Sequence, residues 1–300
     1  GKVCLFSKDG NLLWNYRGVA EVDGELYDVS IYSISISSDG KYIAALGVIL
    51  AKDYTPTIIY FFDKNGNLLW ENRTYYPYYP TSSIYISPNG EYVIAIYNNE
   101  FISFFNKDGK LLWNYDTPTP IVSVSTSFDG SYIAIGGGSI DYSGELYFLN
   151  KDGELLWSKK QLSKMGGVVT SISSDGNFIA AATFGHIYLF DKEGNTLWSR
   201  ECSYSWVSIS SDGEYIATSN GLYNRDGNLL WSFEGVSFEW DEPYVTISSD
   251  GSSIIVFDRN AIYLYNKEGN LIWNYTFPTD IFLMPILEPT FSRQVTSDGS

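Results

Sequence analysis

The sequence predicts an all-β fold, a seven-bladed β-propeller of four-stranded antiparallel blades, because two motifs alternate along the whole chain. One motif is a turn followed by Leu-Leu-Trp, as in residues 8–14, and the other is Ser-Ile-Ser-Ser-Asp-Gly-x-Tyr-Ile-Ala, as in residues 35–44. The tryptophans of the first motif are Trp14, Trp70, Trp113, Trp157, Trp198, Trp231 and Trp273, and the glycines of the second are Gly40, Gly90, Gly130, Gly176, Gly213, Gly251 and Gly299. The outermost copies of each motif are 259 residues apart, a mean period of about 43 residues. Four-stranded propeller blades have this period.

The repeat that begins at Ile31 divides into four predicted strands. Strand a covers residues 31–37, strand b 42–46, strand c 58–63 and strand d 68–72. β-Branched and aromatic residues dominate the apolar runs, which favours strands over helices. Gly, preceded by Asp or Asn, stands where a hairpin needs a positive φ, so turn chemistry explains the acidic residues of the turns without a metal.

Composition excludes several classes of function. Hydrophobic residues make up 44% of the 300 residues, which is ample for a packed core, and the net charge is −16. An acidic chain of this kind repels nucleic acids and anionic lipid surfaces. No run of 18 apolar residues occurs, so we expect no membrane insertion by this domain. The acidic composition, rich in Tyr and Ser, favours an extracellular or cell-surface location.

The two ends of the chain are expected to share one blade. Residues 1–7 align with strand c and residues 12–16 with strand d, whereas residues 291–297 align with strand a. We therefore predict a single propeller domain over residues 1–300, with the last blade shared between residues 1–17 and 290–300 so that both termini close the ring. Strand b of this blade is missing, which suggests a fragment of a longer protein with flanking domains.

Two segments resemble known repeat families. The run from Tyr60 to Trp70, Tyr-Phe-Phe-Asp-Lys-Asn-Gly-Asn-Leu-Leu-Trp, resembles the tryptophan-docking motif of quinoprotein-like (PQQ-type) propellers. Residues 33–45 are similar to the Ser-Pro-Asp-Gly segment of WD-repeat and TolB-like propellers, and the combination resembles repeats of archaeal and bacterial surface proteins. The resemblance implies that the seven motif tryptophans are structural and dock each blade on the next.

Few residues are suited to catalysis. The chain has one histidine, His186, two cysteines, Cys4 and Cys202, that fall in non-adjacent repeats, and no phosphate-binding loop. PQQ enzymes generally have eight blades, calcium ligands and often a vicinal disulfide, whereas this chain has seven repeats and no adjacent cysteines. We therefore expect no catalytic residue, no metal and no cofactor, and we expect both cysteines to be buried.

The connections between strands differ at the two ends of a blade. The a–b and c–d turns are alike in every repeat, whereas the b–c and d–a connections vary, as in residues 18–28 and 136–144. Variable loops on a rigid scaffold are where binding residues concentrate. The ligand-binding candidates are mostly aromatic and acidic residues of these loops: Trp240, Tyr78, Tyr76, Tyr54, Tyr142, Asp53, Asp141, Asp241, Trp206 and Arg293.

Arg293 is included because it stands where the other repeats have an apolar residue or threonine, and Trp206 and Trp240 because they lie outside the tryptophan motif. Aromatic side chains bind both sugar rings and protein hot spots. The sequence therefore predicts a non-catalytic recognition or scaffold propeller that binds a protein or a glycan through the face made by the d–a and b–c loops. The alternative is an enzyme acting on extracellular polysaccharide, or a quinoprotein-like oxidoreductase, which carboxylates of raised pKa would favour.

Overall fold

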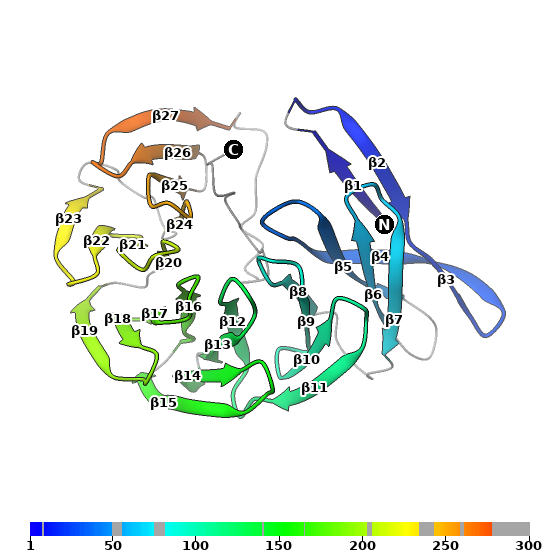
Figure 1. Ribbon diagram of the computed structural model, residues 1–300, viewed down its shortest axis with the longest axis horizontal. Coiled ribbons are helices and arrows are strands. Elements are labelled where there is room, and N and C mark those ends of the chain that lie inside the picture. Colours follow the sequence, from blue (N-terminus) through cyan, green and yellow to red (C-terminus); the bar gives the residue numbers. More distant parts are fainter. Residues whose placement is uncertain are drawn as a thin grey trace. The chain divides into compact units, whose positions relative to one another are not determined.

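The computed structural model describes residues 1–7, 9–49, 56–74, 82–139, 141–164, 166–202, 206–233, 243–258 and 261–277. Every regular element within these residues is a β-strand, and the strands form seven antiparallel sheets, labelled in Figure 1. We call each sheet a blade and number the blades in the order of the repeats, so that blade 1 contains Ile31.

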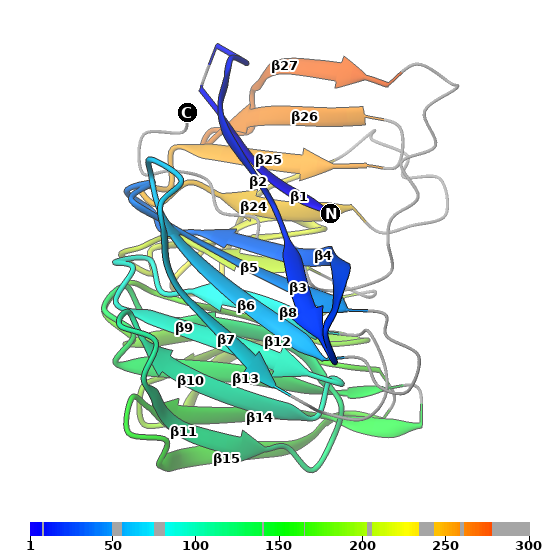
Figure 2. The same ribbon diagram turned by 90° about the vertical axis from the view of Figure 1, so that its right-hand side faces the viewer.

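The blades have the following strands. Blade 1 contains β3 (Val19–Val22), β4 (Glu25–Ile36), β5 (Tyr42–Ile49), β6 (Thr57–Asp63) and β7 (Leu68–Thr74); blade 2 contains β8 (Ser82–Ile86), β9 (Tyr92–Tyr97), β10 (Phe101–Asn106) and β11 (Leu111–Asp116). Blade 3 contains β12 (Ile121–Thr126), β13 (Tyr132–Ser139), β14 (Tyr142–Asn150) and β15 (Leu155–Ser163); blade 4 contains β16 (Val169–Ile172), β17 (Phe178–Ala182), β18 (His186–Asp191) and β19 (Thr196–Glu201). Blade 5 contains β20 (Val207–Ile209), β21 (Tyr215–Thr218), β22 (Gly221–Asn224) and β23 (Leu229–Ser232); blade 6 contains β24 (Tyr244–Ile247), β25 (Ser253–Phe257), β26 (Ala261–Asn266) and β27 (Leu271–Thr276), seen side by side in Figure 2. Blade 7 is described by β1 (Lys2–Phe6) and β2 (Leu12–Arg17).

The chain divides into two compact units, one that begins at Gly1 and runs to Pro118 and one that begins at Thr119. The first contains blades 7, 1 and 2, and the second contains blades 3 to 6. Strands a to d of each complete blade pair in chain order, as the repeat predicts. Successive hairpins therefore place the a–b and c–d turns at one end of a blade, which we call the turn end. The b–c and d–a connections lie at the opposite end, the loop end.

The a–b turn is held by its own side chains. In blade 6, Ser248 Oγ donates a hydrogen bond to Asp250 Oδ1 (2.6 Å), which also accepts one from the Ser252 N–H (3.0 Å). Gly251, with φ of 73°, completes the turn. Blade 2 uses Asn89 in the same way: its Oδ1 accepts from Ser87 Oγ at 2.8 Å and from the Glu91 N–H at 3.1 Å. An amide therefore satisfies the same donors without a charge.

This turn makes stability depend on pH. The hydrogen bonds from Ser248 and Ser252 lower the pKa of Asp250 below its ordinary value. A carboxyl whose pKa is lowered by folding stabilises the protein above its unfolded pKa of about 4 and loses this contribution as the pH falls through the folded pKa. Between about pH 5 and pH 2, we expect the melting temperature of Asp250→Asn to fall less than that of the unmodified protein. If the melting temperatures of the two proteins, measured by circular dichroism, fall by the same amount over this pH range, the expectation is wrong.

Strand d carries a β-bulge in every blade. In blade 1, Phe61 pairs with Trp70 and Phe62 with Leu68, which leaves Leu69 as the extra residue. The equivalent residues are Leu13, Leu112, Leu156, Leu197, Leu230 and Ile272. These seven side chains are between 41% and 58% exposed. A bulge interrupts the outer ladder, which protects the edge strand against pairing with another chain.

Five of the seven motif tryptophans contact the turn end of the following blade within the same compact unit. The Nε1–H of Trp157 in blade 3 donates to the carbonyl of Lys192 in blade 4 at 2.8 Å, and its ring lies against Gly194. A Cβ on Gly194 would lie 2.9 Å from the indole, so only glycine leaves room for the ring. The same pairs are Trp14 with Gly66, Trp70 with Gly109, Trp198 with Gly227 and Trp231 with Gly269.

A second set of aromatic rings repeats this arrangement at the a–b turns. Tyr132 at the start of strand b in blade 3 covers Gly176 in blade 4, where a Cβ would lie 2.4 Å from the tyrosine ring. The other pairs are Tyr42 with Gly90, Phe178 with Gly213 and Tyr215 with Gly251. Lys192 also places its ammonium 4.2 Å from the ring centroid of Tyr132. In blades 2, 4, 5 and 6, both turns are therefore covered by aromatic side chains from the preceding blade.

Serines on strand a form a third set of contacts. Ser123 Oγ in blade 3 accepts the Thr170 N–H of blade 4 at 3.1 Å, and Ser171 Oγ accepts the Ile209 N–H of blade 5 at 3.1 Å. Ser33, Ser35 and Ser208 accept in the same way. Strand a stands at the edge of its sheet in blades 2 to 6, so these bonds satisfy backbone donors that the sheet itself leaves unpaired. This role explains why small serines alternate with apolar residues in strand a.

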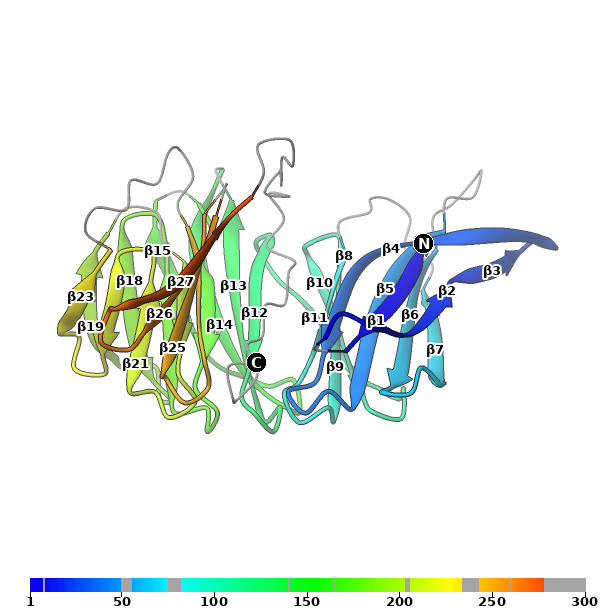
Figure 3. The same ribbon diagram turned by 90° about the horizontal axis from the view of Figure 1, so that it is seen from above.

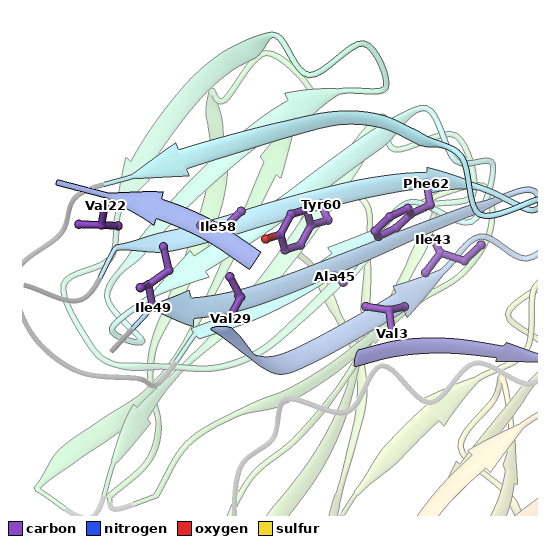
Figure 4. Packing of buried hydrophobic residues seen from close by; sticks show 10 residues of the cluster. Val3, Val22, Val29, Ile43, Ala45, Ile49, Ile58, Tyr60 and Phe62 are labelled. Atoms are coloured by element: carbon purple, nitrogen blue, oxygen red, sulfur yellow. The ribbon is translucent and has the colours of Figure 1, made fainter. Parts of the chain in front are cut away.

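The core between blades 7 and 1 shows how the sheets pack (Figure 4). Val3 of β1, 1% exposed, lies with Ile43, Ala45 and Phe62 of blade 1 in one buried cluster. By contrast, Ile34 and Ile36 on β4 are 43% and 36% exposed. The predicted strand a of blade 7, residues 291–297, lies outside the described residues. That this strand shares a blade with β1 and β2 and closes a single domain stays a prediction.

Two predicted loops are wrong because they form strands. Residues 18–28 contain β3 and the beginning of β4, which form a hairpin, and most of residues 136–144 belong to β13 and β14. Glycine at residues 136–138 suggested a loop. It is required because a Cβ on Gly136 would lie 1.9 Å from the carbonyl oxygen of Val168. The expectation of two buried cysteines is also wrong, since Cys4 is exposed and Cys202 is half-buried.

Candidate functional site

The structure describes three of the ten predicted ligand-binding residues. Tyr142, the first residue of β14, is 51% exposed, and Asp141 precedes it in the b–c turn of blade 3, where its N–H donates to Ser139 Oγ at 3.3 Å. Trp206 lies in the connection from blade 4 to blade 5. The other seven residues lie outside the described part: Trp240, Tyr78, Tyr76, Tyr54, Asp53, Asp241 and Arg293.

Trp206 is held by packing and hydrogen bonds within the protein. Its ring centroid is 4.3 Å from that of Tyr244, and the half-buried indole packs against buried residues of blades 4 to 6. The Trp206 N–H donates to Ser219 Oγ at 3.0 Å, and the Ser219 hydroxyl donates to the Pro243 carbonyl at 3.0 Å. These contacts fix two neighbouring d–a connections to the b–c turn of blade 5. The position of Trp206 outside the motif is thus explained by packing between loops.

Phe184 is a loop-end aromatic residue that the sequence analysis did not select. It lies in the b–c turn of blade 4 and is 56% exposed. The turn is fixed by Thr183, whose N–H and hydroxyl both donate to the His186 carbonyl at 2.9 and 3.0 Å. The signal in the sequence was a phenylalanine beside Gly185 in a turn.

His186 begins β18 and its ring stacks on Tyr188, with centroids 5.7 Å apart. The Tyr188 hydroxyl donates to the Leu162 carbonyl of blade 3 at 3.1 Å. His186 therefore extends an aromatic column that joins two blades. Within the described residues, no group of three or more His, Cys, Asp or Glu side chains is placed to hold a metal ion.

The pKa shifts resolved for aspartates in the described part are all downward. They occur at Asp28, Asp39, Asp63, Asp129, Asp175 and Asp250. At Asp63, for example, a hydrogen bond from the Asn67 side chain lowers the pKa. A general acid needs a carboxyl whose pKa is raised. These aspartates therefore serve as hydrogen-bond acceptors of turns and ion pairs, and they give the enzymatic alternative no support.

Comparison with known proteins identifies the family. The family model described as outer membrane protein assembly factor BamB matches residues 1–223, which is well over half of the chain. The chain belongs to this family. It is therefore a β-propeller repeat protein of the PQQ type, as the docking motif from Tyr60 to Trp70 implied. No curated protein matches the sequence significantly.

Solved structures show the same fold. The crystal structure of BamB from Moraxella catarrhalis has a TM-score of 0.60 and 19% identity, and the match covers 92% of this chain and 82% of that chain. Hydrazine synthase of Kuenenia stuttgartiensis has a TM-score of 0.56 and 12% identity, over 80% of this chain and 77% of that one. Identities this low show the fold alone. The predicted β-propeller is confirmed, and the seven described sheets agree with seven blades.

Proposed function

We propose that this chain is a non-catalytic scaffold of the cell envelope or cell surface that binds a partner protein through the loop ends of its blades. Membership of the BamB family supports a protein as the partner and the envelope as the location. The described part of the chain contains no helix that is both long and apolar enough to span a bilayer.

The observation that carries this proposal is the different use of the two ends of a blade. At the turn end of blades 2, 4, 5 and 6, the glycines of both turns are covered by aromatic rings from the preceding blade, as at Gly194 and Gly176. These side chains are committed to holding the blades together. At the loop end, Tyr142 and Phe184 are 51% and 56% exposed. Exposed aromatic residues on a rigid scaffold supply large contact areas at low entropic cost.

Photo-cross-linking tests this assignment by showing which end of a blade contacts a partner protein. The photo-cross-linking amino acid p-benzoyl-phenylalanine, placed at position 142 or 184 in cells that make the protein naturally, should capture a protein partner. Placed at position 268, in the c–d turn of blade 6, it should not. Covalent adducts formed from position 268 alone would contradict the proposal.

The captured partner then allows affinities to be compared. We expect Tyr142→Ala or Phe184→Ala to weaken binding by about 2 kcal/mol, roughly thirtyfold, because an aromatic anchor loses its buried contact. The melting temperature should stay unchanged, since both side chains are exposed. Leu156→Ala is the matched control: Leu156 is 45% exposed on strand d of the same blade as Tyr142, and its loss should leave affinity unaltered.

A further inference from the structure

The hairpin formed by β3 and the first residues of β4, Val19–Asp28, is an addition to the repeat. Pairing of β4 with β5 begins at Val29, so residues 19–28 take no part in the ladder that the other blades share. The d–a connection from β11 to β12, by comparison, spans residues 117–120 and contains no strand. Figures 1 and 3 show the hairpin extending beyond β5, β6 and β7 of its own blade. A departure from an otherwise regular repeat needs an explanation of its own.

The hairpin is a well-defined structure. Asp23 and Gly24 both have positive φ, 53° and 82°, as a two-residue type I′ turn requires. Its inner face is buried: Ala20 is 2% exposed and Val22 is 8% exposed, and both belong to the cluster that contains Ile58 of β6. Figure 4 shows Val22 at one end of this cluster.

Two arginines fix the hairpin in place. Arg73 of β7 donates from Nη1 to the Glu21 carbonyl at 3.2 Å. Arg17 binds both carboxylate oxygens of Asp28, with Nε at 2.8 Å from Oδ1 and Nη2 at 2.9 Å from Oδ2. A bidentate pair of this kind gives directional support. The hairpin therefore presents its outer face in a fixed orientation relative to blade 1.

The outer face combines an apolar centre with an acidic surround. Cross-strand pairing of Val19 with Asp28 and of Glu21 with Leu26 places these four residues on one face. Leu26 is 75% exposed, more than any other large hydrophobic residue in the described part of the chain, and Val19 is 39% exposed. Asp28 is paired with Arg17, Glu21 lies beside Leu26 on this face, and Asp23 is in the turn at the tip. Glu25 pairs with Val22 on the opposite face, where its carboxylate accepts a hydrogen bond from the Tyr27 hydroxyl at 2.9 Å.

Edge protection explains only part of this arrangement. Charged residues on an exposed edge strand discourage pairing with other chains, which accounts for the acids. It does not account for a leucine held in water at the centre of the same face, since Leu26 adds nothing to the core. An apolar anchor inside a polar rim is the pattern of a protein interface.

We propose that the outer face of this hairpin docks a partner protein, whose apolar pocket receives Leu26 and whose lysine or arginine side chains face Glu21 and Asp23. The inference rests on the proposed function as a protein-binding scaffold and names its contact surface and the charge of its partner. Charge decides the class of partner, because carboxylates at the tip are repelled by anionic lipid headgroups and by nucleic-acid phosphates.

Photo-cross-linking in cells that make the protein naturally tests the docking surface. With p-benzoyl-phenylalanine at position 26, we expect one covalent adduct with a partner protein, whose cross-linked peptide lies in a basic surface. Position 13 is the control, since Leu13 is a 58% exposed leucine of the ordinary repeat. Leu26→Asp and Glu21→Lys should each reduce affinity for the captured partner at least tenfold. Binding should also weaken as salt concentration rises.

Three controls keep the outcome decisive. Leu26→Met should retain affinity, and all variants should keep the melting temperature of the unmodified protein. Asp9→Lys with Glu268→Lys, at the turn end, should leave affinity unchanged. If the charge reversal in the hairpin leaves the affinity unchanged, the proposal that the partner surface is basic is wrong.

Adducts separate this inference from the proposed function. Adducts at positions 142 or 184 but not at 26 would overturn the hairpin as the docking surface and leave the proposed function standing. Adducts at none of these positions would overturn both the docking surface and the proposed function. An adduct between two copies of this chain, or one carrying a glycan or lipid in place of a peptide, would also overturn the hairpin proposal.

Discussion

Replacement of Trp198 by alanine is expected to lower the free energy of unfolding by about 3–5 kcal/mol, the usual cost of removing a buried aromatic ring. Trp198 is 8% exposed, its Nε1–H donates to the Arg225 carbonyl at 2.7 Å, and its ring lies against Gly227. The change therefore leaves a cavity between blades 4 and 5 and a carbonyl without its donor. Urea unfolding followed by circular dichroism measures the loss without relying on tryptophan fluorescence.

Leu197→Ala is the matched control for this prediction. It removes a large apolar side chain from the neighbouring position of the same strand, but Leu197 is 45% exposed. We expect a cost below about 1 kcal/mol, because exposed side chains contribute little. Equal losses in the two variants would show that contact of the Trp198 indole with the next blade adds nothing.

The second large effect is expected at the glycine that receives a tryptophan. Gly194→Ala places a methyl group 2.9 Å from the Trp157 ring and also forces alanine to adopt φ of 85°. Left-handed backbone costs alanine about 1–2 kcal/mol, and crowding of a packed site typically adds about 1–3 kcal/mol. We therefore expect a total loss of about 2–5 kcal/mol in the free energy of unfolding.

Gly24→Ala separates the two contributions. Gly24, in the turn of the β3–β4 hairpin, has a similar φ of 82°, but a Cβ there has no other atom within 4 Å. Its replacement should cost only the backbone strain. In a Trp157→Ala background, the cost of Gly194→Ala should fall to the value measured at Gly24, a coupling that a double-mutant cycle reports. Additive losses would contradict the proposed contact between the methyl group and the indole.

The candidate site was less predictable than the fold. Tyr142 is exposed in a b–c turn as expected, whereas Trp206 packs on Tyr244. Both are aromatic residues in variable connections, so their sequence context does not distinguish them. The difference arises from Ser219 and Pro243, which lie 13 and 37 residues further along the chain and hold Trp206 in a packed loop. Exposure of a loop residue depends on neighbours that a single sequence does not reveal.

The hairpin at Val19–Asp28 shows a signal that was present but was not used. Asp23-Gly24 between short alternating segments is typical of a type I′ hairpin, yet two glycines and four acids within eleven residues suggested a loop. Burial of Ala20 and Val22 against blade 1 stabilises the strands, which the local sequence alone does not. The exposure of Leu26 follows from the same packing, because its neighbours in the chain face inward.

The sequence by itself determined the number of repeats, the order of strands a to d and the positions of the a–b and c–d turns. These features depend on local chemistry: glycine at positive φ, side-chain caps such as Ser248 with Asp250, and alternation of apolar residues within a strand. Only the tertiary structure decided which side chains connect the blades and which are left for a partner. The reason is distance along the chain, since Trp157 meets the Lys192 carbonyl 35 residues away. A contact of this kind exists only after both blades have folded and packed.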